Sequence, residues 1–128
     1  MGNYKNYKVW EKSHQLVLNV YRLTKNFPKS EQYNLTSQMN RASVSIPTNI
    51  AEGCGRETQK EFIRFLYIAS GSAHELDYLL LLASDLGYIE SKISQNIISE
   101  IDEIKKMLAA LINTIKASLK TKVQQLEA

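Results

Sequence analysis

The sequence contains few of the residues that break or crosslink a chain. Its 128 residues include one cysteine, two prolines and five glycines. A single cysteine excludes an internal disulfide framework and fits a reducing compartment. No segment approaches the ~18 consecutive apolar residues of a membrane span, and the N-terminus has no apolar region typical of a signal peptide. We therefore expect a cytoplasmic protein that makes no membrane contact.

Residues that carry catalytic or metal chemistry are also scarce. Neither His14 nor His74 has a second histidine or a cysteine at metal-ligand spacing. Cys54 has no neighbour that would make it a nucleophile, so we interpret it as a small apolar residue in a core or interface. The sequence has no Gly-rich phosphate loop followed by lysine and no recognition-helix pattern for a DNA groove. It predicts no catalytic residue, no metal site and no cofactor, and hence a non-enzymatic protein.

Helical periodicity dominates the rest of the chain, with almost no strand signal. Apolar residues recur at steps of three and four, and the glycines and prolines gather at the ends of the periodic segments. The expected helices cover residues 9–26, 31–54, 58–86 and 91–126. Short connections between long helices favour antiparallel neighbours. We therefore expect one all-α domain over residues 1–128, an antiparallel up-down-up-down four-helix bundle.

Local signals predict where two of these helices begin and how they are distorted. Ser30 is the expected N-cap of the second helix, and Thr58 with Glu61 forms a capping box for the third. Pro47 removes one hydrogen bond within the second helix and predicts a kink. Gly71, in the middle of the third helix, costs about 1 kcal/mol relative to alanine, which close approach of another helix would offset.

The fourth helix has the longest apolar stripe. Its members recur at steps of three or four, as in a coiled-coil seam: Ile93, Ile97, Ile101, Ile104, Leu108, Leu111, Ile115 and Leu119. The second helix has a matching apolar arc at Leu35, Met39, Ala42, Ile46 and Ile50. At ~1.5 Å per residue the fourth helix is longer than the third. Its last turns, residues 120–128, are expected to overhang or fray.

The most informative stretch is RASVSIPTNIAEGCGR, residues 41–56. Its polar side chains fall within an arc of about 80° on one helical face: Arg41, Ser45, Asn49, Glu52 and Arg56. On the third helix, Arg64, Gly71 and Glu75 share a face that can pair with this stripe. Arg41 with Glu75, or Glu52 with Arg64, would make charge-assisted pairs across helices or across subunits. The alternative is an arginine-lined groove that receives an anion or a phosphate.

Charge is unevenly distributed along the chain, although the net charge is only +3. Residues 1–56 hold 8 Lys or Arg against 3 acids, and residues 57–128 hold 8 against 10. The basic excess lies on and beside the first helix, at Lys5, Lys8, Lys12, Arg22, Lys25 and Lys29, and predicts a nucleic-acid-binding surface. An ordinary solvated helix face is the alternative. Tyr4, Tyr7 and Tyr21 lie among these lysines. They are expected either to stack on single-stranded nucleic acid or to lie at the edge of the core or of a subunit contact.

Two segments carry a family resemblance: QMNRASVSIPTNIAEGCGR and KEFIRFLYIASGSAHEL, preceded by FPKSEQYNLTSQ. Over about residues 7–88 the chain resembles the four-helix-bundle family of 23S rRNA intervening-sequence proteins. A related branch is the accessory variability determinant proteins of diversity-generating retroelements.

The resemblance implies a ring-shaped homo-oligomer, with a pentamer the expected state. Small residues on the third helix, at Ala69, Gly71, Ser72 and Ala73, would provide a face on which copies pack. The resemblance also implies a partner, either RNA or an RNA–protein complex, held by the basic surface. The alternative is a protein-interaction scaffold that docks a partner enzyme such as a reverse transcriptase.

Overall fold

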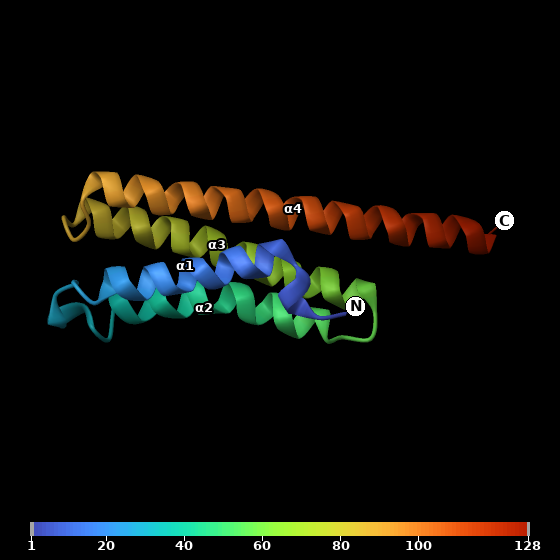
Figure 1. Ribbon diagram of the computed structural model, residues 1–128, viewed down its shortest axis with the longest axis horizontal. Helices are drawn as coiled ribbons and strands as arrows, with labels where there is room; N and C mark the ends of the chain where they lie inside the picture. Colours follow the sequence, from blue (N-terminus) through green and yellow to red (C-terminus); the bar gives the residue numbers. More distant parts are fainter. Residues whose placement is uncertain (1, 128) are drawn as a thin grey trace.

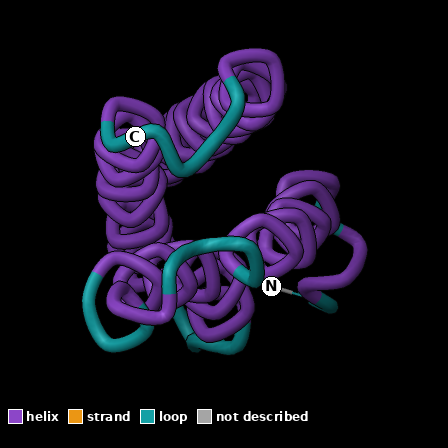
Figure 2. Tube along the Cα trace, turned by 90° about the vertical axis from the view of Figure 1, so that its left-hand side faces the viewer, coloured by secondary structure: helices purple, strands orange, loops and turns teal. Residues whose placement is uncertain are grey.

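The computed structural model describes residues 2–127 and contains four α-helices and two short 3₁₀ turns. The helices are α1 (Lys8–Thr24), α2 (Leu35–Cys54), α3 (Gln59–Asp85) and α4 (Ser91–Glu127), and the turns are η1 (Tyr4–Asn6) and η2 (Lys29–Glu31). The described residues contain no strand, as predicted. Successive helices run in opposite directions (Figure 1) and surround a common interior when seen end-on (Figure 2). The fold is the expected all-α, up-down-up-down bundle.

Local chemistry explains where α3 begins and ends. Thr58 Oγ1 accepts a hydrogen bond from the N–H of Glu61 at 3.1 Å, which is the capping contact that the sequence predicted. At the other end, Gly87 has a φ of 81°, and the amides of Gly87 and Tyr88 donate back to carbonyl groups of the last turn. This way of ending a helix requires a left-handed residue, which glycine adopts without steric cost.

The start of α2 differs from the expectation. The helix begins at Leu35 rather than at residue 31, and Ser30 lies within η2 instead of capping α2. The chain after Pro28 first forms a 3₁₀ turn, in which the N–H of Glu31 donates to the Pro28 carbonyl at 2.9 Å. The N–H of Gln32, one of the amides that an N-cap at Ser30 would bind, donates to the Lys29 carbonyl at 3.1 Å instead. Further along, α2 remains helical through Pro47.

The core is formed by the apolar sides of all four helices. The predicted arc of α2 is buried throughout. On α4 the buried stripe departs from the prediction at two places, because Ile93 is 43% exposed and Ile112, at 4%, is buried more deeply than its neighbour Leu111. A straight α-helix has about 3.6 residues per turn, so positions seven residues apart rotate slowly around the helix axis. Further along α4, the neighbouring residue therefore faces the core.

Gly53 permits a close approach of α2 and α3. A Cβ on Gly53 would lie 2.6 Å from Cβ of Phe65 and 2.9 Å from Cδ1 of Phe62, so no larger residue fits without a shift. Gly71 differs, because a Cβ there would meet no atom of the described residues within 4 Å. The prediction that a neighbouring helix approaches Gly71 is therefore wrong within one chain. The close crossing is at Gly53 instead.

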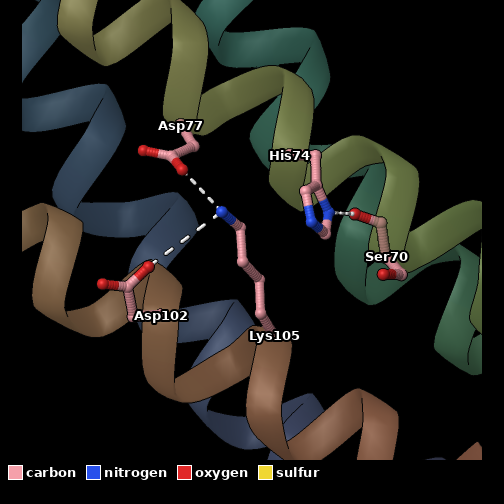
Figure 3. Close-up of polar contacts among 5 residues, drawn as sticks. All are labelled: Ser70, His74, Asp77, Asp102 and Lys105. Carbon is pink, nitrogen blue, oxygen red and sulfur yellow. Dashed lines mark hydrogen bonds and ion pairs between the residues drawn. The ribbon is translucent and has the colours of Figure 1, made fainter.

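A partly buried lysine links α3 to α4. Lys105 Nζ lies 2.5 Å from Asp77 Oδ2 on α3 and 4.0 Å from Asp102 Oδ1 on its own helix (Figure 3). His74 lies nearby on α3 but turns back onto its own helix, where Nδ1 is 2.8 Å from the Ser70 carbonyl oxygen (Figure 3). The charge on Lys105 is thus balanced by two carboxylates, and His74 takes no part in that pairing.

The C-terminal part of α4 extends beyond the other helices (Figure 1). The described side chains from residue 120 onward are exposed, including Val123 at 52% and Leu126 at 87%. The predicted overhang is therefore present, and it is helical. No helix within residues 2–127 is both long enough and apolar enough to cross a membrane.

Candidate nucleic-acid interface

The predicted basic residues lie along α1 and at both of its ends. Lys5 is in η1, Lys8, Lys12 and Arg22 are on α1, and Lys25 and Lys29 flank the connection to α2. All are exposed except Lys12, which is partly buried. Of these six cations, only Lys12 has an acidic partner among the described residues within ion-pair distance. Its Nζ lies 2.8 Å from Glu103 Oε1. No acid among the described residues neutralises the other five by direct contact.

A groove between α1 and α4 contains two of these cations. It has a volume of about 360 Å³ and is lined by Lys8 and Lys12 together with Glu11, Glu100 and Glu103. Acids outnumber the cations in this groove, so its own field does not favour a phosphate. The opposing glutamates come from α4, about 90 residues after the lysines. For that reason the sequence pattern of the first helix did not indicate them.

The opposite end of α1 carries a group of cations with no acid paired to them among the described residues. Lys25 and Lys29 border a cavity of about 170 Å³ at the connection from α1 to α2. Arg22 lies one turn earlier, and its guanidinium donates to Asn19 Oδ1 at 2.9 Å. No carboxylate of the described residues pairs with these three cations. The predicted basic set thus divides into a group opposed by acids, beside α4, and an unopposed group at the turn into α2.

The polar stripe of α2 lies along the seam with α3, where its uncharged members form a small network. Ser45 Oγ and Ser72 Oγ are 2.8 Å apart and join the two helices. Asn49 Nδ2 donates to both the hydroxyl and the carbonyl of Ser45, at 3.0 and 2.8 Å. The sequence had placed Ser72 on a face of small residues, and its hydroxyl role was missed because the partner lies 27 residues earlier on another helix.

The charged members of the stripe and of its mate on α3 are exposed: Arg41, Glu52, Arg56, Arg64 and Glu75. Within residues 2–127 of one chain, no ion pair joins them. Arg41 and Glu75 nevertheless border one cavity of about 310 Å³, and the Arg56 guanidinium lies 4.8 Å from the centre of the Phe65 ring. Pairing across subunits, and the anion groove, stay predictions.

The surroundings of Tyr7 indicate the edge of a core. Its ring meets Phe62 edge-on with centroids 5.7 Å apart. Burial raises the pKa of the Tyr7 phenol above its ordinary 10.0, and the nearby Cys54 raises it further. Cys54 is buried, and its thiol donates to the Gly2 carbonyl at 3.0 Å. Tyr7 therefore fits the second interpretation of the tyrosines, as core-edge side chains.

Chemistry and fold together define a class. In the part of the chain that the structure describes, no three His, Cys, Asp or Glu side chains are placed to hold a metal ion. The geometry is that of an all-α helical-bundle protein with exposed cations at one end of α1 and a hydrogen-bonded seam between α2 and α3.

The chain belongs to the 23S rRNA-intervening sequence protein family, which matches residues 5–110. Among solved structures it is similar to a protein of unknown function from the S23 ribosomal protein family of Bacteroides thetaiotaomicron. The two are 28% identical, with a TM-score of 0.76 over 81% of this chain and 97% of that chain. No curated protein matches. The family resemblance is thereby confirmed, and the overhanging end of α4 lies outside the family match.

Proposed function

We propose that this protein is a non-enzymatic, cytoplasmic homo-oligomer that binds RNA through the basic residues on and beside α1. The observation that carries the proposal is the lack of an ion-pair partner, among the described residues, for five of the six predicted cations. Exposed cations without acidic partners attract a phosphate backbone by releasing its counterions. The name of the family, which refers to 23S rRNA, supports RNA as the polyanion.

The outward side of α3 is the surface on which we propose that copies pack. It exposes four large apolar side chains: Tyr67, Ile68, Tyr78 and Leu81, at 50, 46, 60 and 51%. Neighbouring exposed apolar groups mark interaction sites. The small residues Ala69 and Ala73 cannot serve here, since both are fully buried in the core. A pentamer is the expected state, and a ring would repeat each basic group five times around one axis.

Sedimentation equilibrium at micromolar concentration tests the oligomer, because an interface of standard size persists there. A single species at the chain mass of 14.6 kDa would contradict it. Tyr78→Glu should dissociate the assembly. Tyr33→Glu is the matched control, because Tyr33 is 87% exposed on the connection to α2 and should leave the mass unchanged.

RNA binding is tested by fluorescence anisotropy of a labelled single strand at several salt concentrations. The logarithm of affinity should fall with the logarithm of salt, with a slope of about −0.7 per neutralised phosphate. A variant with glutamine at Lys5, Arg22, Lys25 and Lys29 should bind more weakly and show a flatter slope. The matched control has glutamine at Lys60, Lys92, Lys106 and Lys120, which removes the same charge from exposed positions elsewhere.

Two results would contradict the RNA proposal. If the intact oligomer does not bind at about 50 mM salt, the protein-interaction scaffold becomes the better function. If both glutamine variants lose affinity equally, net charge rather than the surface around α1 governs binding.

A further inference from the structure

The single tryptophan of the chain lies in a small array of rings at the start of α1. Trp10 and His14 are stacked, with centroids 5.3 Å apart and planes inclined by only 4°. Tyr4 of η1 packs edge-on against Trp10, with ring centroids 4.9 Å apart. His14 is exposed, and Trp10 and Tyr4 are partly so. The rings are therefore ordered by one another and still accessible from solvent.

These rings border a groove between α1 and α2, two helices that lie side by side in Figure 1. The groove has a volume of about 380 Å³, which is within the range of about 300–1,000 Å³ typical of ligand sites. Its far wall is formed by α2, where Val44 and Pro47 present apolar surface. A flat apolar guest can thus contact the stacked rings on one side and aliphatic groups on the other.

The charged side chains nearest this groove are one lysine, which lies beside Tyr4, and one glutamate in its lining. Lys5 Nζ lies 5.9 Å from the centre of the Tyr4 ring at one end. Beyond the groove, the exposed side of α1 continues through Tyr21, 42% exposed, to Lys25, which borders the cavity at the connection to α2. Glu52 is the acid that lines the groove. A strand whose bases lie against these rings would extend along the exposed side of α1, with its phosphates toward Lys5 and Lys25 and away from Glu52.

We propose that this groove is a stacking site for unpaired bases of single-stranded RNA. The proposal rests on the proposed RNA-binding function and specifies the form of RNA and the place where it is read. Bases in a duplex are already stacked on one another, so only an unpaired base can lie against Trp10 and His14. A planar base also fits a site whose ordered element is a pair of parallel rings. Contact with every base type is expected, because each has a π-face.

The test uses the intact protein and the fluorescence of Trp10, which reports on this groove alone because the chain has no other tryptophan. Titration with single-stranded oligouridylate and oligoadenylate should quench Trp10. A duplex RNA of the same length, at a concentration where anisotropy shows it bound, should leave the emission unchanged.

A variant separates stacking from charge. His14→Ala removes an exposed ring and should weaken single-strand binding about tenfold, with the salt slope unchanged, because stacking releases no counterions. Tyr33→Ala is the matched control, since it removes an exposed ring outside the groove. It should leave affinity and slope unchanged.

Each failure has its own meaning. RNA that binds without quenching Trp10, and with equal affinity to His14→Ala, would overturn the stacking site but keep the RNA proposal. An absence of any RNA binding by anisotropy would reject the proposed function itself. A change in Trp10 emission on dilution of the protein alone would show that a second copy covers the groove, and would overturn the proposal for RNA.

Discussion

The two helical glycines Gly53 and Gly71 should respond in opposite directions to the same substitution. Alanine in the middle of a helix is more favourable than glycine by about 1 kcal/mol, because the glycine backbone loses more freedom on folding. At Gly71 nothing in the part of the chain that the structure describes opposes that gain, since a Cβ would meet no atom there within 4 Å. At Gly53 the new methyl group would lie 2.6 Å from Cβ of Phe65.

The destabilisation expected for Gly53→Ala depends on which atom the new methyl group would contact. A Cβ is fixed to its backbone, so rotation of the Phe65 side chain cannot relieve the contact and α2 must move away from α3. Overpacking of this kind costs about 1–3 kcal/mol, and contacts of 2.6 and 2.9 Å place the cost at the upper end of that range, about 3 kcal/mol. After the gain in helix propensity, Gly53→Ala should lose about 2 kcal/mol, and Gly71→Ala should gain about 1 kcal/mol. In melting temperature these are shifts of about −8 °C and +4 °C.

Urea denaturation followed by circular dichroism measures both variants, with the m-value checked for constancy. Equal shifts for the two, or a stabilised Gly53→Ala, would refute the argument that α2 and α3 meet at Gly53. A destabilised Gly71→Ala accompanied by a lower oligomer mass would show instead that another copy approaches Gly71.

Three further predictions concern a loop contact, the polar stripe and the overhang. The pKa of Tyr88 is raised above 10.0, first by its hydrogen bond to Glu31 Oε2 at 2.9 Å and then by burial and by the Glu31 charge, so this contact stabilises the fold below pH 10.0 and is lost above it. Tyr88→Phe should therefore be less stable than the parent at pH 7, with a difference in urea midpoint that shrinks as the pH rises beyond 10.0. Glu52→Ala should change the free energy of unfolding by less than about 0.5 kcal/mol, because Glu52 is exposed and unpaired among the described residues of its own chain, and a larger loss would reveal a partner in another copy. Truncation after Leu119 should leave the melting temperature within about 2 °C, and a larger drop would mean that the overhang packs against something.

The sequence by itself determined the helices of this protein, because a helix depends mainly on contacts within a few residues. The apolar arc of α2 and the cap at Thr58 were both readable from spacing and residue type. The family followed for a similar reason, since its motifs are contiguous segments. The start of α2 was misplaced because a 3₁₀ turn after Pro28 competes with a helix cap over the same few residues.

Tertiary structure decided everything that depends on which helices are neighbours. Only the packed bundle distinguishes Gly53, where two backbones approach, from Gly71, which faces solvent. Only it sets the α4 glutamates opposite Lys8 and Lys12, and so divides one basic stretch of sequence into an opposed and an unopposed part. Coulomb interactions and steric contact depend on distance in space. For residues about ninety positions apart in the chain, that distance is fixed only when the helices pack.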